Sequence, residues 1–545
     1  IFKEVGAIGV REGVDLILIE TMSDSYEAKA AILAAKENSN LPVFATMIFG
    51  ENGKLLTGGN VQSAVAMLEG LRVDALGINC GLGPVQMKGI CKELLSYASI
   101  PVIVNPNAGL PRSENGHTVF DVDPNAFANT MEEIVAMGAV VVGGCCGTTP
   151  NHIQQLVKAC KGQQPKLIEN KNLTMVSSYS HAVVIGDEPV IIGERINPTG
   201  KLKFKQALRD NDLEYVLKEG LRQQEKGAHI LDVNVGLPDI DEVAMMKRVI
   251  VELQSIIDLP LQIDTSNIAA MEQAMRLYNG KPLVNSVNGK MEIMEQVFPL
   301  MKKYGGVVVA LCLDEDGIPE TAEGRIKVAK KIYEEAAKYG IDKKDIILDG
   351  LAMTISSDST SAFTTLETIR RIRDELNGKS VLGVSNISFG LPQREIINAA
   401  FYTMAMQNGL NAGIINPNSE SMMQSYYAFK ALNNMDPQCG AYISHYAGQT
   451  TTTARVAQKS DMTLRESVMK GLKDRANTAS KQLLCEKEPL EIINEELIPA
   501  LDIVGQGFEK GTLFLPQLLM SAEAAKAAFE VIKGFMAKAG TVQEK

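Results

Sequence analysis

The feature that most constrains the fold is a strand–helix alternation that repeats eight times between Val183 and about Asn433. Each repeat is a short, nearly continuous apolar segment followed by a helical period, which is typical of parallel strands buried on both faces of a sheet. The apolar segments are VIIGE, HILDVN, PLQID, PLVNS, GVVVAL, DIILD, SVLGVS and NAGII. The span is close to the ~250 residues of a (β/α)8 barrel, so we predict a TIM-type barrel over residues 183–435.

Polar residues stand at or near the ends of seven of these eight segments. The carboxyl ends of the strands form the active face of such a barrel, so side chains at these positions converge on one rim. A single polar strand end is common, but a series of them favours a ligand site over chance. The residues are Glu194, Asp232 with Asn234, Asp264, Asn285, Asp349, Asn386 and Asn416.

A shorter series of the same kind precedes this barrel, in residues 1–160. Its apolar segments are DLILIE (15–20), PVFATMIF (42–49), ALGINC (75–80), PVIVNPN (101–107) and AVVVGGCC (139–146). An eight-unit barrel needs three units more than these five, and Ile1 already lies in a helix-like pattern. We therefore expect a second TIM-type barrel that lacks its N-terminal strands because the true start of the chain is missing.

From Thr463 onward the pattern is purely helical. Helices fit over about 464–484, 489–508 and 515–537, and Thr463 with Glu466 has the spacing of a capping box. These segments predict a small all-α bundle over residues 463–538. Loop composition predicts linkers over 161–182 and 436–462, and 539–545 resemble the start of another linker. The expected fold class is α/β: two (β/α)8 barrels, the first incomplete, then the bundle.

Charge and cysteine content narrow the class of partner. A formal net charge of −11, with Lys and Arg scattered, argues against nucleic acid. No apolar run approaches the ~18 residues of a membrane helix, so no membrane partner is expected. Eight cysteines in 545 residues, without a short disulfide framework, indicate reduced thiols in a cytoplasmic protein, some of which can bind metal. Small molecules are the expected ligands.

The stretch VVVGGCCGTTP (140–150) ends a strand in two adjacent cysteines. Cys145 and Cys146 are badly placed to pair with each other, because a disulfide needs Cα separations and side-chain directions that neighbours rarely offer. Cys80 ends another strand of the series, on the same rim. Three thiolates around Zn²⁺ leave one tetrahedral position open, as in catalytic zinc sites. The alternative is that these cysteines pack as small hydrophobic residues.

The cysteines also lie in the motifs of a known family. INCGLGP, NPNAGLP and GGCCGTTP, in this order, resemble the homocysteine S-methyltransferase domain over residues 1–160. The resemblance implies that Cys80, Cys145 and Cys146 bind zinc. It also implies that Asn107, in the PNAG turn, approaches the metal when substrate is absent, and that Glu20 faces the homocysteine. For Glu20 the alternative is a charge at the start of a helix.

Motifs in the eight-unit series resemble the pterin-binding domain of dihydropteroate synthases and methyltetrahydrofolate:corrinoid methyltransferases. They are IGERINPTG, LDVNVG, QIDTSN and GVSNISFGLPQR, and the last favours the methyltransferase branch. A pterin ring presents donors that suit a carboxylate and further groups that suit amides. The folate-binding residues implied by the resemblance are Asp232, Asn234, Asp264, Asn285, Asp349 and Asn386.

Two of these residues are implied to be catalytic, Asn386 and Asp264. Asn386 would lie near N5, the nitrogen that carries the methyl group and that leaves only when it gains positive character. We expect Asn386 to hydrogen-bond the protonated N5, with the proton arriving through water or a carboxylate. For Arg195 and Asn197 both a ligand-binding and a structural role stay open.

The segment GFEKGTLFLPQLLMSAEAAKAA resembles the helical cap that covers the upper face of methylcobalamin. The resemblance implies that the cobalamin contacts are Phe508, Phe514, Leu515 and Leu518. Ordinary bundle core is the alternative for such an apolar cluster. A corrinoid domain with an Asp-x-His-x-x-Gly signature follows this cap in the family, and this chain does not contain it. We expect that domain to act in cis in a full-length protein.

Together, the three domains resemble the cobalamin-dependent methionine synthase family along essentially the whole chain. The resemblance implies zinc and cobalamin as cofactors, and 5-methyltetrahydrofolate and homocysteine as substrates. The implied reactions move a methyl group from 5-methyltetrahydrofolate to cob(I)alamin and from methylcobalamin to zinc-activated homocysteine, giving tetrahydrofolate and methionine. The alternatives are a stand-alone methyltetrahydrofolate:corrinoid protein methyltransferase and a non-catalytic scaffold that docks a corrinoid protein.

Overall fold

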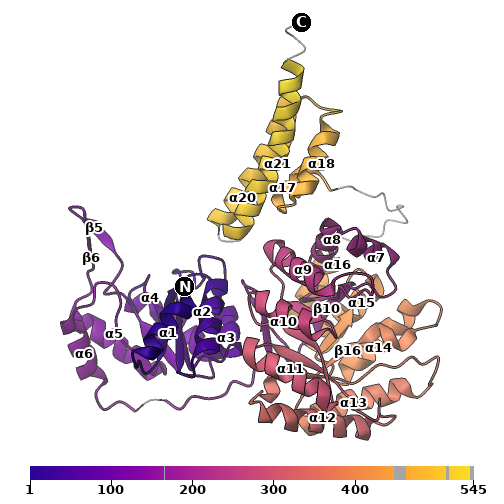
Figure 1. Ribbon diagram of the computed structural model, residues 1–545, viewed down its shortest axis with the longest axis horizontal. Coiled ribbons are helices and arrows are strands. Elements are labelled where there is room, and N and C mark those ends of the chain that lie inside the picture. Colours follow the sequence, from indigo (N-terminus) through magenta and orange to yellow (C-terminus); the bar gives the residue numbers. More distant parts are fainter. Residues whose placement is uncertain (165, 447–461, 511–512, 514, 541–545) are drawn as a thin grey trace.

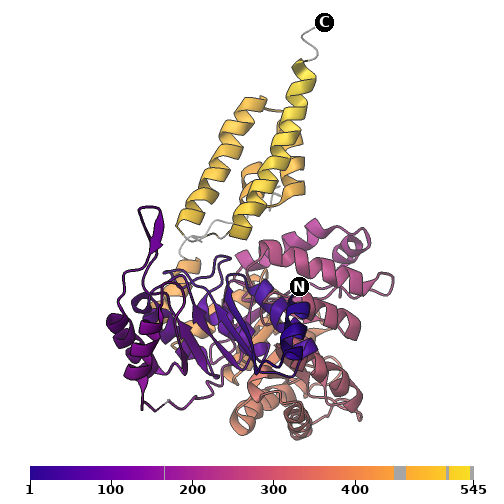
Figure 2. The ribbon, with the colours of Figure 1, turned by 60° about the vertical axis from the view of Figure 1, so that its left-hand side comes forward.

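The computed structural model describes residues 1–164, 166–446, 462–510, 513 and 515–540. It has three parts: an N-terminal open sheet with helices (indigo to purple), a closed barrel (magenta to orange) and a helical C-terminal part (yellow), as Figure 1 shows. The helical part lies above the other two in Figure 1 and again in Figure 2, which is turned by 60°.

The predicted eight-stranded barrel is confirmed. Eight parallel strands close on themselves, and the first strand pairs with the last. Branched side chains such as Val190, Ile192 and Val309 are buried inside it. The strands are β10 (Val190–Ile196), β11 (Ile230–Val233), β12 (Leu261–Asp264), β13 (Leu283–Asn288), β14 (Val307–Leu311), β15 (Ile346–Asp349), β16 (Lys379–Gly383) and β17 (Ala412–Ile415).

Amphipathic helices cover the outside of the barrel. Several begin at an aspartate or asparagine whose side chain accepts hydrogen bonds from the first turn, as Asp241 and Asn267 do. The helices are α7 (Leu202–Arg209), α8 (Leu213–Glu225), α9 (Glu242–Ile256), α10 (Ile268–Leu277), α11 (Met291–Tyr304), α12 (Ala322–Lys338), η1 (Lys343–Asp345), α13 (Ser361–Leu376), η2 (Val384–Ser388), α14 (Arg394–Gln407) and α15 (Glu420–Leu432).

The N-terminal part contains the five expected parallel strands, in the order β1-β2-β3-β4-β7, but they form an open sheet. Edge strand β1 and the first helix leave apolar side chains in solvent: Val5 is 64% exposed and Leu18 43%. The strands are β1 (Ile17–Met22), β2 (Val43–Met47), β3 (Ala75–Asn79), β4 (Val102–Asn105) and β7 (Val141–Val142), with a hairpin of β5 (Arg112–Glu114) and β6 (His117–Val119). The helices are α1 (Phe2–Arg11), α2 (Ser25–Asn38), α3 (Val61–Gly70), α4 (Pro84–Tyr97), α5 (Pro124–Met137) and α6 (Pro150–Cys160).

The expected linker 161–182 is partly wrong, because its end belongs to a hairpin of β8 (Met175–Ser177) and β9 (Ala182–Val184). Val176 and Ile185 pack against the inward-facing residues of the barrel. Ser177 and Lys281, which precedes β13, exchange backbone hydrogen bonds. The hairpin therefore closes the amino-terminal end of the barrel. The run SSYSH has loop composition, yet its serines are buried and hydrogen-bonded, so composition concealed the hairpin.

Buried polar contacts join the N-terminal part to the barrel. Lys29 of α2 is 1% exposed, and its Nζ donates to the carbonyl oxygens of Met275 and Tyr278 at 2.7 and 2.6 Å. These carbonyls lie at the end of α10, where a positive charge is favourable. Burial lowers the pKa of Lys29 to about 7. Nearby, Arg276 pairs with Glu37 at 2.6 Å. The two parts thus share an ordered interface.

The C-terminal part is helical, but the first predicted helix, 464–484, is broken in two. Helix α17 (Leu464–Met469) begins with the predicted capping box of Thr463 and Glu466, which is confirmed, and α18 (Lys473–Leu483) follows. Between them Gly471 has φ +70°, a conformation that favours glycine. A Cβ at Gly471 would lie 2.8 Å from the Cβ of Met520, so the chain turns where α21 packs closely.

The remaining helices are η3 (Pro437–Cys439), α16 (Gly440–Tyr446), α19 (Pro489–Ile492), the π-helical η4 (Ile493–Leu497), α20 (Ile498–Glu509) and α21 (Leu515–Gly540). Helix α16 occupies part of the expected linker 436–462, whose residues 447–461 lie outside the described residues, as do 541–545 at the end of the chain. No helix in the described ranges has both the length and the apolar character required to cross a bilayer.

Candidate functional site

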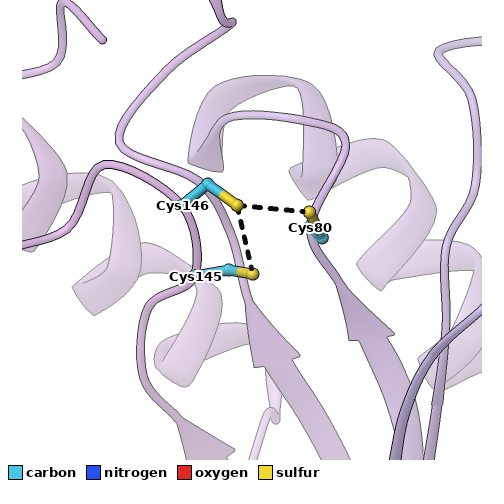
Figure 3. Close-up of side chains that lie close together, drawn as sticks. All are labelled: Cys80, Cys145 and Cys146. Carbon is cyan, nitrogen blue, oxygen red and sulfur yellow. Dashed lines mark hydrogen bonds between the residues drawn. The ribbon is translucent and has the colours of Figure 1, made fainter. Parts of the chain in front are cut away.

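Three cysteine thiols meet beyond the carboxyl ends of β3 and β7 (Figure 3). The Sγ of Cys146 lies 3.7 Å from that of Cys80 and 4.0 Å from that of Cys145. All three sulfurs lie within 4.8 Å of one another. A tetrahedral zinc ion with metal–sulfur bonds of about 2.3 Å holds its sulfurs about 3.8 Å apart. The cluster therefore has the spacing that a zinc site of three thiolates needs.

Turns rather than regular strand place these thiols. Cys80 has φ +59°, which is uncommon for any residue but glycine, and its N–H donates to the carbonyl of Asn105. The N–H of Cys145 donates to the carbonyl of Pro106 at 2.8 Å. Gly147 has φ +78°, and a Cβ there would lie 2.4 Å from an aromatic ring. The loops after β3, β4 and β7 are thus tied to one another around the sulfurs.

A cation that binds this cluster has to displace a proton from Cys145. Burial, then the neighbouring Cys80, raises the pKa of the Cys145 thiol to about 12. Without a positive partner this thiol stays protonated at neutral pH, whereas a coordinating thiol is deprotonated by the metal. Cys80 and Cys145 are half-buried and Cys146 is exposed, so a ligand can approach from solvent.

The two residues predicted to contact homocysteine differ in their surroundings. Asn107 is buried beside the thiols, and its Oδ1 accepts a hydrogen bond from the N–H of Cys146 at 3.0 Å. Glu20 is exposed on β1. Its neighbour Thr21 is hydrogen-bonded to Asn79, the residue before Cys80. Glu20 therefore lies one residue from a direct contact with the strand that carries a thiol.

The carboxyl ends of the barrel strands surround a cavity of about 500 Å³. The predicted folate-binding residues that line it are Asp232, Asp264, Asn285, Asp349 and Asn386, together with the strand-end residues Glu194 and Asn416. Asn234 does not line it: its Nδ2 donates to Asp264 Oδ2 at 3.0 Å, and its Oδ1 accepts from the N–H of Gly236. Asn234 thus fixes the orientation of Asp264 without lining the cavity itself.

The carboxyl groups of this cavity bind protons more tightly than usual. Burial raises the pKa of Asp264 to about 6, although the hydrogen bond from Asn234 opposes the change. Burial also raises the pKa of Asp349 to about 6. For Asp232 burial, then the charge of Asp264, raises the pKa well above its usual range. Near neutral pH the cavity can therefore both present carboxylates and hold a proton.

Asn386 lies in η2, directly beyond β16. Arg394 braces this segment, because its guanidinium donates to the carbonyl of Ser385 at 2.6 Å and to Ser388 Oγ at 3.0 Å. It also stacks over the ring of Phe389, 4.4 Å from the centroid. Arg394 and Phe389 line the cavity and were missed as site residues, although both stand in the motif GVSNISFGLPQR.

Arg195 and Asn197 differ in the contacts they make. Arg195 lines the cavity, and its Nε also pairs with the buried carboxylate of Glu219 at 3.7 Å, a contact that favours a structural role. Asn197 Nδ2 lies 3.4 Å from Asp232 Oδ2 and 3.5 Å from Asp264 Oδ2, inside the cavity. The contacts of Asn197 favour direct contact with a ligand.

Two buried polar atoms of the cavity lack a partner among the described residues. They are Asn398 Oδ1 and Ser419 Oγ, on residues that are 8% and 5% exposed. An unsatisfied buried polar group costs about 1–3 kcal/mol. A polar ligand that reached these atoms would remove this cost, which fits a cavity built for a ligand with several hydrogen-bonding groups.

Of the predicted cobalamin contacts, Phe508 lies near the end of α20 and Leu518 in the first turn of α21. Phe508 is 40% exposed and Leu518 is half-buried. Leu515 is the first residue of α21, and Phe514 lies outside the described residues. Leu519 is 57% exposed on the same helix. Large apolar side chains in solvent at one end of a helical unit are typical of a surface that binds an apolar partner.

Comparisons with known proteins follow the same division of the chain. The homocysteine S-methyltransferase model matches residues 1–160, the pterin binding enzyme model 193–416 and the B12 binding domain model 463–533. The methionine synthases of Mycobacterium leprae and Mycobacterium tuberculosis are each 29% identical, over 98% and 97% of this chain and 48% of their own length. The chain spans about half the length of these curated relatives.

Solved structures also align with this chain. Dihydropteroate synthase from Xanthomonas albilineans in complex with 7,8-dihydropteroate covers 48% of this chain and 98% of its own, with 17% identity and a TM-score of 0.37. Dihydropteroate synthase of Yersinia pestis covers 48% of this chain and 99% of its own, with 16% identity and a TM-score of 0.38.

Proposed function

We propose that the chain belongs to the cobalamin-dependent methionine synthase family and transfers methyl groups in methionine synthesis, since three domain models of that set match it in order and two methionine synthases align along nearly its whole length. The methyl group moves from 5-methyltetrahydrofolate to cobalamin and from the methylated cofactor to homocysteine, giving tetrahydrofolate and methionine. The observation that carries the proposal is that one chain holds a three-thiol cluster and a carboxylate-lined barrel cavity, each at the carboxyl ends of parallel strands.

The barrel cavity is the proposed folate site. The carboxylates of Asp264 and Asp349 accept hydrogen bonds from the N–H groups of the pterin, and the amide of Asn285 both donates and accepts. Asp232 lines the same rim, held by Gln262 Nε2 at 2.7 Å. Further polar atoms of the ligand meet Asn398, Ser419 and Asn197, and Asn234 fixes the direction of Asp264.

The proposed chemistry at N5 depends on a proton. The methyl group leaves only when N5 gains positive character. Asn386 Oδ1 accepts a hydrogen bond from the protonated N5. Asp264 is proposed to be catalytic because its carboxylate fixes the pterin ring. Asp232 beside it is the carboxyl group proposed to hold the proton, because burial and the charge of Asp264 raise its pKa well above the usual range.

The thiol cluster is the proposed homocysteine site, with Cys80, Cys145 and Cys146 as zinc ligands. Zinc, when bound, lowers the pKa of a substrate thiol at its open position. Asn107 approaches this position from beside Cys146, and Glu20 binds the amino acid part of homocysteine. Reduced thiols are required, which fits a cytoplasmic protein.

The C-terminal helices are the proposed cap over cobalamin, with a corrinoid domain in cis in the full-length protein as the partner. Cobalamin, when bound, carries the methyl group between the two substrates. Phe508 and Leu518 cover it from α20 and α21. Phe514 and Leu515 are proposed as further cobalamin contacts, as the resemblance implies.

The proposed domain boundaries are 1–160 for homocysteine, 183–435 for folate and 463–538 for the cap. The β8–β9 hairpin, which begins within 161–182, belongs with the folate barrel, and 436–462 separates this barrel from the cap. We also propose that the open sheet is part of a (β/α)8 barrel. The support is the apolar surface at β1, where Val5 and Leu18 are exposed as if further strands and helices covered them.

The proposal is tested by methyl transfer from 5-methyltetrahydrofolate to exogenous cob(I)alamin, comparing this chain with Asp264→Ala and Asn386→Ala. We expect transfer that both substitutions impair, and folate binding that Asp264→Ala weakens more than Asn386→Ala does. A folded protein that binds no folate would overturn the folate assignment. Folate binding without any transfer, even with a separate corrinoid protein, would instead favour a docking scaffold.

A further inference from the structure

Asn79 is the last residue of β3, directly before Cys80, and it is 1% exposed. We propose that Asn79 is a positioning residue: its side-chain amide donates to the Cys145 sulfur and ties that metal ligand to the irregular end of β1 that carries Glu20. This inference rests on the proposed zinc site and adds a link between that site and the proposed homocysteine-binding strand.

The hydrogen bonds of Asn79 fix the orientation of its amide. The backbone N–H of Thr21 can only donate, and it lies 2.8 Å from Asn79 Oδ1. The hydroxyl of Thr46 also donates to Oδ1, at 2.8 Å. The oxygen therefore faces β1 and β2, and a flipped amide would set Nδ2 against the Thr21 N–H. Nδ2 must face the thiols.

Both hydrogens of Nδ2 then have acceptors. One is Thr21 Oγ1 at 2.6 Å, and the other is Cys145 Sγ at 3.9 Å. An amide nitrogen has two hydrogens and its oxygen two acceptor positions, so all four positions of Asn79 are used. A thiolate, the form that binds metal, is a stronger acceptor than a thiol, so the contact with sulfur gains strength when a metal binds.

The contact between Asn79 and Thr21 affects the strand that carries Glu20, the residue proposed to bind homocysteine. Thr21 has φ +62°, which is a strained conformation for a β-branched residue. Asn79 holds this irregular part of β1 at both the Thr21 N–H and the Thr21 hydroxyl. Glu20 is the residue before Thr21, so the same amide fixes the backbone beside Glu20 and the direction of the Cys145 sulfur.

Two effects on the metal follow from an N–H donor to a ligating sulfur. The donor withdraws electron density from the sulfur, and it restricts the rotamer of Cys145. Outer partners of metal ligands typically change metal affinity by about 10–100-fold when they are removed. A purely structural Asn79, which only joined β1, β2 and β3, would give neither effect.

The test uses Co²⁺ in place of zinc, bound to the whole chain under reducing, oxygen-free conditions, with the sulfur-to-cobalt charge-transfer band as the readout. Asn79→Leu removes every hydrogen bond of the amide. Asn79→Asp keeps the oxygen acceptors for Thr21 and Thr46 but has no N–H. Thr46→Val is the matched control, because it removes a hydrogen bond to the same Oδ1 and leaves Nδ2 in place.

We expect both Asn79 variants to move the band to lower energy, and Asn79→Leu to weaken Co²⁺ and Zn²⁺ binding about tenfold. Thr46→Val should lower the melting temperature without moving the band. An unmoved band in Asn79→Asp, or the same movement in Thr46→Val, would overturn the inference. Failure of the wild-type chain to bind either metal would overturn the proposed zinc site itself, and this outcome is distinct.

Discussion

The two proposed ligand-binding regions of this molecule both lie at the carboxyl ends of parallel strands, but they place their side chains differently. In the barrel the residues of the cavity stand at the strand ends themselves, as Asp264 and Asp349 do, and burial changes their pKa values. In the open sheet the thiols stand in the turns beyond the strands, where Cys80 has a positive φ and Cys146 is exposed. A site for a pterin ring has to enclose its ligand, whereas a metal site needs only a few ligand atoms that point in fixed directions.

The largest effect is expected at the thiol cluster. Cys145→Ser removes a soft ligand and leaves two sulfurs, so zinc affinity should fall by more than ~100-fold, beyond the range of an outer partner. Competition with a chelator measures the affinity. Cys485→Ser is the matched control, since Cys485 is an exposed cysteine of the C-terminal helices and should leave zinc binding unchanged. Equal zinc affinities of Cys145→Ser and Cys485→Ser would show that the thiol cluster does not bind the zinc.

In the barrel we expect a smaller effect from Asp349→Asn. The amide keeps the oxygen that accepts from the N–H of Leu351 at 2.7 Å, but it removes the charge. A charged hydrogen bond contributes about 1.5–3 kcal/mol, so folate affinity should fall about 10–100-fold. Titration calorimetry measures it. Asp316→Asn changes the same charge on an exposed residue and is the control; a similar loss there would point to general electrostatics.

Lys29→Met tests whether the two regions behave as one unit. The substitution leaves the carbonyls of Met275 and Tyr278 without their donor, at a cost of about 1–3 kcal/mol. We expect separate melting transitions for the N-terminal part and the barrel, observed by calorimetry. Lys36→Met is the control, because Lys36 donates to Arg72 within the N-terminal part. A single transition for Lys29→Met at the wild-type temperature would contradict a coupled interface.

The smallest effect is a pH dependence confined to the barrel. Protonation of Asp349 below about pH 6 removes the charge that a pterin N–H meets, so folate affinity should fall about tenfold from pH 6 to pH 5. Stability should change in the opposite direction. The folded state binds this proton more tightly than the unfolded chain, so the ligand-free protein loses stability as pH rises from about 4 to 6. Asp349→Asn should remove the Asp349 contribution to both slopes.

Sequence prediction succeeded where a feature depends on residues that are close together in the chain. It failed where a feature depends on contacts between residues that are far apart in the chain. The barrel strands are local patterns, and a polar residue such as Asp264 stands at or near the end of seven of the eight, so both features could be predicted. The break at Gly471 could not, because it depends on the close approach of Met520 from another helix. The role of Asn79 depends likewise on Thr21 and Cys145, 58 and 66 residues away.

The hairpin that closes the amino-terminal end of the barrel has a kinetic consequence. Val176 and Ile185 pack into that end, and the interior above them is filled by side chains, so the cavity has one mouth. In the proposed function, a methyl acceptor must therefore use the same mouth as the methyl donor. The donor therefore has to enter first and leave last. Initial-rate kinetics with both substrates varied should then show a compulsory order of binding, with the released pterin as the last product.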